Sequence, residues 1–80
     1  MGNKHGLLEQ ERTDLIRQRH LVQISQHELA QQAGVKFSRV HWWESGRIEL
    51  TPDELKCIKR VLRRAAAETM AEIAEIVAAQ

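Results

Sequence analysis

The sequence predicts an all-α fold, in which three short helices precede one long C-terminal helix. Proline occurs once and glycine four times in 80 residues, so few positions interrupt a helix. No run alternates apolar and polar residues for long enough to indicate a strand. Tyrosine is absent and phenylalanine occurs once, which disfavours a sheet. A chain of this length is expected to form one small domain.

The first two helices are predicted from apolar spacing and from capping residues. Residues 8–22 place four apolar side chains roughly on one face, namely Leu8, Leu15, Ile16 and Val22. The start of this helix is open, since Thr13 and Asp14 could also cap a later beginning. Ser25 and Glu28 have the spacing of a capping box, and Gly34 is a helix stop. The second helix is therefore expected between Ser25 and Gly34.

Two further helices are predicted from apolar spacing and capping residues in the same way. Residues 37–44 should form the third, with Val40 and Trp43 facing inward. Successive side chains of a helix lie about 100° apart, so Trp42 must point elsewhere. Thr51, Pro52 and Glu54 are typical of a second capping box, and no breaker follows them. Apolar residues then recur at steps of three and four through Leu55, Ile58, Leu62, Ala65, Thr69 or Met70, Ile73 and Val77.

Composition argues against several classes of function. The single cysteine, Cys57, cannot form an internal disulfide, and the four histidines lack ligand spacing, so we expect no metal site. No nucleophile–base set, carboxylate pair or phosphate loop is present, so we expect no enzyme, cofactor or small-molecule substrate. The opening residues lack the apolar run of a signal peptide, and no segment could span a membrane. We therefore expect a cytoplasmic protein.

The stretch LIRQRHLVQISQHELAQQAGVKFSRVHWWESGR resembles the lambda-repressor/Cro family of DNA-binding domains, also called the XRE family. The resemblance covers residues 13–62, between a lead-in of residues 1–12 and an extension of residues 63–80. It depends on Arg19, Ile24-Ser25-Gln26, Glu28-Leu29-Ala30, Ala33-Gly34-Val35, Val40, Glu44, Gly46 and the TPDEL segment. Two departures stand inside it. Lys36 replaces a usual Ser or Thr cap, and Gln18 replaces a core leucine whose place Ile16 or Leu21 could take.

The resemblance implies a helix-turn-helix domain whose third helix enters the major groove of double-stranded DNA. The expected base contacts are Lys36, Phe37, Ser38, His41 and Trp42. The expected phosphate contacts are Gln26, Arg39 and Arg47. Arg19 and Glu44 match a structural ion pair of the family. Phe37 or Trp42 could instead fill a contact with a protein, and the polar residues could be ordinary solvated side chains.

Charge is segregated along the last helix, although the net charge is only +1. Residues 55–64 carry five basic residues and no acid, whereas residues 65–80 carry Glu68, Glu72 and Glu75 and no base. The extension leaves an apolar stripe that we predict to be a homodimer interface, made of Met70, Ile73, Ile76 and Val77. An antiparallel pair would bring the basic stretch of one chain toward the glutamates of the other. The alternative is a monomer whose extension folds back onto its first helix.

Three functions fit these expectations. The first is a sequence-specific transcriptional regulator, most simply a repressor, that binds an inverted repeat as a homodimer with half-sites about one helical turn apart. The second is the antitoxin of a toxin–antitoxin pair that regulates its own operon, which implies a protein partner. The third is a helical adaptor that binds a protein, such as the transcription machinery, through Phe37 and Trp42 and does not bind DNA.

Overall fold

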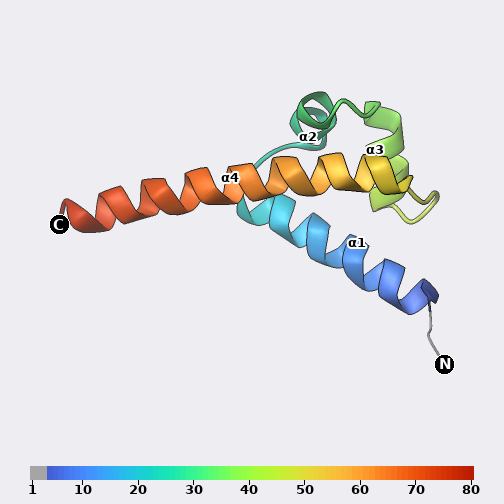
Figure 1. Ribbon diagram of the computed structural model, residues 1–80, viewed down its shortest axis with the longest axis horizontal. Helices are drawn as coiled ribbons and strands as arrows, with labels where there is room; N and C mark the ends of the chain where they lie inside the picture. Colours follow the sequence, from blue (N-terminus) through green and yellow to red (C-terminus); the bar gives the residue numbers. More distant parts are fainter. Residues whose placement is uncertain (1–3) are drawn as a thin grey trace.

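The computed structural model describes residues 4–80, and these residues form four helices and no strand. The helices are α1 (Lys4–Leu21), α2 (Gln26–Ala33), α3 (Phe37–Glu44) and α4 (Pro52–Ala78), as Figure 1 shows. The predicted all-α fold is confirmed. The first three residues of the expected lead-in lie outside the described residues.

The predicted capping boxes fix the beginnings of α2 and α4. The backbone N–H of Glu28 donates to Ser25 Oγ (3.0 Å), and the backbone N–H of Ser25 donates to Glu28 Oε1 (3.3 Å). Thr51 and Glu54 repeat the arrangement at 3.1 Å and 2.8 Å. Gly34 ends α2 with a φ of 71°, a left-handed conformation that favours glycine. These helix boundaries were predictable because the side chains that satisfy the free N–H groups are local in sequence.

Helix α1 begins four residues before the predicted position, at Lys4, so residues 4–12 are helical. Contacts from distant parts of the chain reach this first half of the helix. Glu11 Oε2 lies 2.7 Å from Lys59 Nζ of α4. Arg12 lies 3.9 Å from Glu49, in the loop that follows α3. The sequence has no capping box at Lys4, because Gly6 stands where Glu or Gln would complete one, and for that reason the pattern alone placed the start too late.

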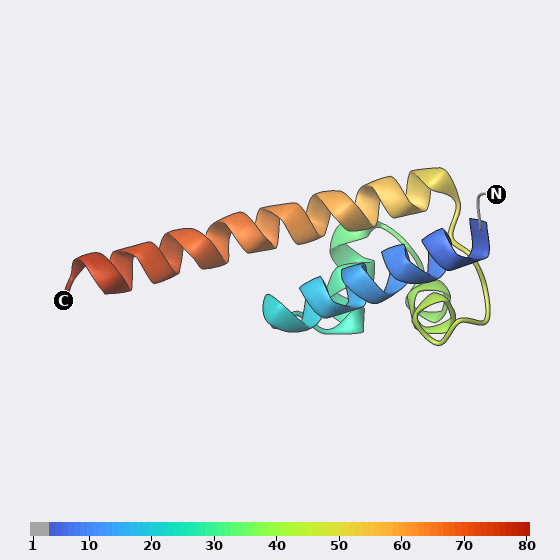
Figure 2. The ribbon, with the colours of Figure 1, turned by 90° about the horizontal axis from the view of Figure 1, so that it is seen from below.

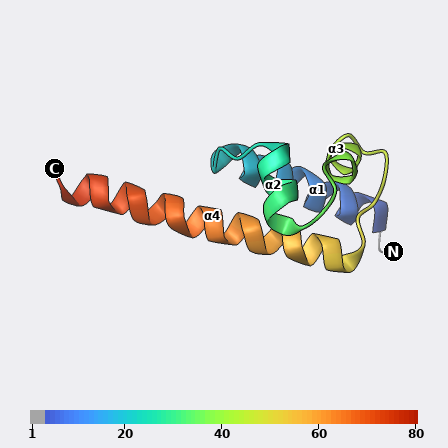
Figure 3. The ribbon, with the colours of Figure 1, turned by 90° about the horizontal axis from the view of Figure 1, so that it is seen from above.

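Side chains from all four helices and from the loop before α4 form the core. The buried residues are Leu15, Leu29, Ala30, Val40, Trp43, Leu50, Ile58, Val61 and Leu62. Helices α1 and α2 pack against both α3 and α4. Figures 2 and 3 show α3 near the N-terminal end of α4, where Arg39 of α3 pairs with Glu54 of α4. The side of α3 that carries Phe37, His41 and Trp42 is exposed.

Gln18, which departs from the family pattern, is exposed. Ile16 is half-buried, whereas Leu21 is 68% exposed and does not replace the missing core leucine. Of the two expected substitutes, only Ile16 contributes apolar burial.

The second half of α4 extends away from the body as a single straight helix (Figure 1). Residues 71–80 are all exposed. We refer to residues 66–80 as the tail. The alternative in which the extension folds back onto α1 is wrong, because the helix continues without a break.

Candidate nucleic-acid interface

The two adjacent tryptophans of α3 lie on different sides of the helix, as predicted. Trp43 is 2% exposed and sits in the core beside Val40, which is completely buried. Trp42 is 43% exposed. The register of α3 is therefore the predicted one. Its outer face carries Trp42, together with the exposed side chain of His41.

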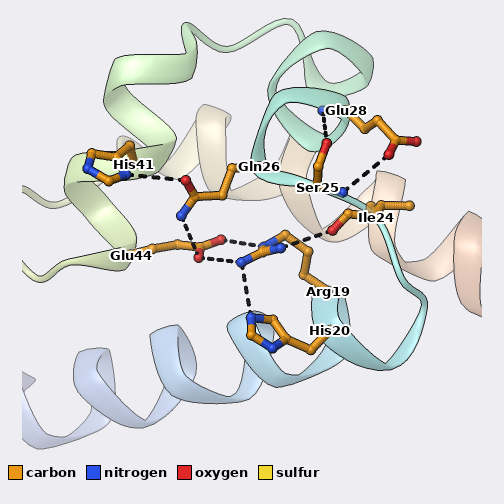
Figure 4. A network of polar contacts seen from close by, with 8 residues as sticks. All are labelled: Arg19, His20, Ile24, Ser25, Gln26, Glu28, His41 and Glu44. Atoms are coloured by element: carbon orange, nitrogen blue, oxygen red, sulfur yellow. Dashed lines mark hydrogen bonds and ion pairs between the residues drawn. The ribbon is translucent and has the colours of Figure 1, made fainter.

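A buried ion pair ties the end of α3 to α1 (Figure 4). Arg19 donates from Nε to Glu44 Oε2 (2.7 Å) and from Nη2 to Glu44 Oε1 (2.8 Å). Arg19 Nη1 also donates to the backbone carbonyl of Ile24 (2.9 Å). The Arg19 and Glu44 side chains are only 13% and 7% exposed. Such a bidentate pair sets the position of α3 closely, because removal of either partner would leave a buried charge unpaired.

Gln26 extends this network to the exposed face of α3 (Figure 4). Its Nε2 donates to Glu44 Oε1 (2.9 Å), which fixes the orientation of the amide, because a carboxylate only accepts. Gln26 Oε1 then faces His41 Nδ1 at 3.2 Å, so Nδ1 is the protonated ring nitrogen in this contact. The expected phosphate-binding residue thus also holds an expected base-contacting residue in place.

An aromatic strip crosses from α2 to α3, and it consists of His27, Phe37 and His41. The rings of His27 and Phe37 stack in parallel, with centroids 3.7 Å apart and an interplanar angle of 4°. The rings of Phe37 and His41 lie 5.9 Å apart. Phe37 remains 37% exposed, so the strip is a surface feature. The contribution of His27 was not predicted, and no sequence signal places it opposite Phe37.

The other predicted base contacts lie at the beginning of α3. Lys36 is exposed and precedes the helix without a side-chain capping bond, as its departure from the family pattern suggested. Ser38 is half-buried. Lys36, Phe37 and Ser38 thus follow one another at the N-terminal end of α3.

The two arginines expected to bind phosphate have different surroundings. Arg39 donates from Nε (2.6 Å) and Nη2 (2.7 Å) to the carboxylate of Glu54 on α4. The hydrogen bonds from Arg39 lower the pKa of Glu54 to about 2, and the same pair raises the pKa of Arg39. Arg39 therefore links α3 to α4. Arg47 is exposed and makes no side-chain hydrogen bond or ion pair within residues 4–80, so its guanidinium is available to a ligand.

The predicted interface residues of the tail are exposed. Met70, Ile73, Ile76 and Val77 are exposed by 70%, 54%, 57% and 65%. A step of about 100° per residue puts the centre of Glu68, Glu72 and Glu75 on the other side of the helix from these residues, although Glu72 lies beside Ile76, one turn further on. Lys59 is already paired with Glu11 of its own chain. The other four basic residues of 55–64 form no ion pair among the described residues, and the antiparallel homodimer stays a prediction.

The described residues include no helix with the length and apolar character of a membrane span, and no cluster of three metal-ligating side chains. Comparison of the chain with protein-family models, with curated proteins and with solved structures found no match.

Proposed function

We propose that the chain is a sequence-specific DNA-binding regulator of transcription, with the helix-turn-helix arrangement of lambda-repressor-like domains. The observation that supports this best is the placement of α3. Val40 and Trp43 anchor its inner face, while Arg19 and Glu44 fix its end against α1. Its other side is exposed at Phe37, His41 and Trp42. A single α-helix presented in this way fits the major groove of B-DNA.

The side chains along α3 suit the edges of bases. Lys36 can donate to guanine O6 and N7, and Ser38 and His41 can donate to bases or to phosphate. Phe37 and Trp42 can pack against thymine methyl groups, and the indole N–H of Trp42 can donate to a phosphate. Because Phe37 is stacked on His27, its ring would enter the groove in a fixed orientation.

Contacts to phosphate would come from Gln26 and Arg47. Gln26 is the first residue of α2, where free backbone N–H groups and the helix dipole favour an anion. Arg47 follows α3 in a turn in which its own N–H donates to the carbonyl of Trp42 at 2.8 Å. We leave Arg39 out of this set, because a phosphate would have to displace the Glu54 carboxylate.

Repression is the simplest outcome of such binding, with two copies on an inverted repeat. A protein-binding adaptor remains the second candidate. The exposure of Phe37 and Trp42, together with a net charge of only +1, favours it. An adaptor would use the same surface for a protein and would have no affinity for DNA.

Selection of bound duplexes from a random pool tests the proposal directly. We expect a recurring motif and binding that weakens steeply as salt rises, because phosphate contacts release counterions. Lys36→Ala and Ser38→Ala should relax preference at particular base pairs. Arg47→Ala should weaken binding to specific and random DNA alike and should reduce the salt slope by about 1. Gln26→Ala should weaken both as well, and it should also change the preference at a base that His41 contacts, because Gln26 holds that ring.

Arg60→Ala is the matched control for Arg47→Ala, because it removes the same charge from an exposed position on α4, outside the proposed interface. It should leave binding nearly unchanged. If Arg60→Ala and Arg47→Ala weaken binding equally, only net charge matters and α3 does not face the DNA. No bound duplex at any salt concentration would favour the adaptor.

A further inference from the structure

We propose that His41 recognises an amino group in the major groove, either N6 of adenine or N4 of cytosine. Gln26 is its positioning residue, because it holds the neutral ring with the hydrogen on Nδ1 and so leaves Nε2 as an acceptor. The recognition of a base rests on the proposed function, whereas the position of the hydrogen does not.

The direction of each hydrogen bond in this network follows from Glu44, whose side chain is only 7% exposed. Its two carboxylate oxygens accept from Arg19 at 2.7 Å and 2.8 Å. A carboxylate paired with a guanidinium has no hydrogen to donate, so the atom of Gln26 that lies 2.9 Å from Glu44 Oε1 is the amide nitrogen. The amide oxygen of Gln26, which only accepts, is then left for His41.

This order of contacts determines which nitrogen of His41 carries the hydrogen. His41 Nδ1 lies 3.2 Å from Gln26 Oε1, and two acceptors cannot form a hydrogen bond, so Nδ1 is the donor. A neutral imidazole carries one N–H only, so Nε2 has a free lone pair. In Figure 4, this second nitrogen lies on the edge of the ring that is turned away from Gln26.

A second contact restrains the plane of the His41 ring. Phe37 is one helical turn away, and the two rings lie 5.9 Å apart with an interplanar angle of 18°. Phe37 is itself stacked on His27 of α2. His41 is exposed, and its Nε2 makes no hydrogen bond to any of residues 4–80. The ring therefore presents Nε2 to a ligand in one orientation.

An acceptor in the major groove selects amino groups. Adenine N6 and cytosine N4 are the donors on the base edges there, whereas guanine O6, thymine O4 and the purine N7 atoms are acceptors. The lone pair of Nε2 would meet a second lone pair at any of these acceptors. Donation from the neutral ring to a base would need the hydrogen on Nε2, at the loss of the hydrogen bond to Gln26. Of the contacts open to His41, acceptance from an amino group is thus the one that the network favours.

Gln26 can position His41 and bind a phosphate at the same time. Its Nε2 carries two hydrogens, of which Glu44 accepts one. The second remains for a phosphate at the beginning of α2. Replacement of Gln26 therefore has two separable effects, which are a loss of affinity for all sequences and a change of preference at one base pair.

NMR of the full chain tests the position of the hydrogen without DNA. Two-bond ¹H–¹⁵N spectra at about pH 8, the upper end of the range in which histidine changes charge, distinguish a protonated ring nitrogen from an unprotonated one. His41→Asn identifies the signals of this ring. We expect Nδ1 to be protonated and Nε2 unprotonated, and the opposite result in the native chain would overturn the proposal.

Gln26→Met removes the acceptor with little change in size and should shift the ring toward the Nε2–H form. Gln32→Met is the matched control, because it makes the same change at an exposed position of α2 that lines a hollow against α4. It should leave the ring as it is in the native chain. Circular dichroism confirms that each variant is folded, and the native chain alone decides the first result.

Duplexes with single-group changes test what His41 reads. Selection with the native chain and with His41→Ala identifies the base pair whose preference depends on His41. At that pair, one duplex carries hydrogen in place of the amino group, and a matched duplex carries C–H in place of the purine N7. Removal of the amino group should weaken binding of the native chain at least about fivefold, the lower end of discrimination by one base contact. Removal of N7 should leave it nearly unchanged.

The variants separate this contact from other effects of the altered duplexes. His41→Ala should respond to neither change. Gln26→Met should bind every duplex more weakly and lose its sensitivity to the amino group, whereas Gln32→Met should keep the native pattern. A larger loss for the native chain on removal of N7 than on removal of the amino group would overturn the proposal.

Failure of this inference can be told from failure of the proposed function. A selected motif in which no base pair depends on His41 would overturn the inference and leave the proposed function intact. If no motif is selected at all, the proposed function and the recognition of a base both fail, and the NMR result still decides the position of the hydrogen.

Discussion

Replacement of each tryptophan in turn tests the register of α3, on which the proposed interface depends. Trp43 is 2% exposed in the core, and truncation of a buried tryptophan to alanine costs about 3–5 kcal/mol. A chain of 80 residues has a total stability of roughly 4–12 kcal/mol. Trp43→Ala should therefore remove a large part of the stability, with a fall in Tm of at least roughly 12 °C.

Trp42→Ala should change the free energy of unfolding by less than about 1 kcal/mol, because nearly half of the Trp42 side chain is already in water. It should weaken specific DNA binding by roughly 1–3 kcal/mol, if α3 reads the groove. Thermal unfolding followed by circular dichroism measures the first effect. Trp42→Phe and Trp43→Phe provide a second readout, because the remaining indole should be shielded from acrylamide quenching in the former and open to it in the latter.

The reasoning is refuted if Trp42→Ala lowers Tm more than Trp43→Ala does. In that case α3 would be rotated by about one residue, and the outer face would carry a different set of side chains. Equal quenching of the two single-tryptophan variants would lead to the same conclusion.

Three further substitutions test separate parts of the structure. Arg39 lowers the pKa of Glu54 to about 2, so the stabilisation from this pair is fully present above the ordinary carboxyl pKa and is lost as pH falls toward 2. Glu54→Gln should therefore lower the free energy of unfolding by about 1 kcal/mol at pH 7. In urea titrations, the midpoint of this variant should converge with that of the native chain near pH 2. Glu44→Gln should destabilise by about 3–5 kcal/mol because it leaves the guanidinium of Arg19 buried without its countercharge, and a loss below 1 kcal/mol in denaturant titration would contradict that account. Gly34→Ala should cost about 1–2 kcal/mol from left-handed backbone strain alone, since a Cβ there meets no atom within 4 Å; an unchanged Tm would contradict this.

Much of the fold could be predicted from the sequence, because capping residues and helical periodicity are local in the chain. Ser25 with Glu28, and Thr51 with Glu54, mark helix beginnings through contacts three residues apart. The inward positions of α3 follow from helical periodicity. The early start of α1 has no such local signal, and the contacts of Glu11 with Lys59 span the chain.

The side-chain contacts between helices could not be predicted as well. Glu54 was recognised as a capping residue, but one carboxylate accepts both from the backbone N–H of Thr51 and from Arg39. This second role removed Arg39 from the proposed phosphate contacts. The stacking of His27 on Phe37 depends on the crossing of α2 and α3, which residue types do not reveal. By contrast, the resemblance had already paired Arg19 with Glu44, and the structure contains that ion pair.

The unbroken course of α4 from Pro52 to Ala78 has a consequence for how this chain can change in length. One residue inserted near position 65 would rotate the whole tail by about 100° relative to the body and advance it by about 1.5 Å. An insertion of seven residues would restore the orientation to within about 20° and lengthen the helix by about 10 Å. Substitutions on the acidic side of the tail should therefore be tolerated far more readily than insertions or deletions, because α4 sets a rotational phase as well as a length.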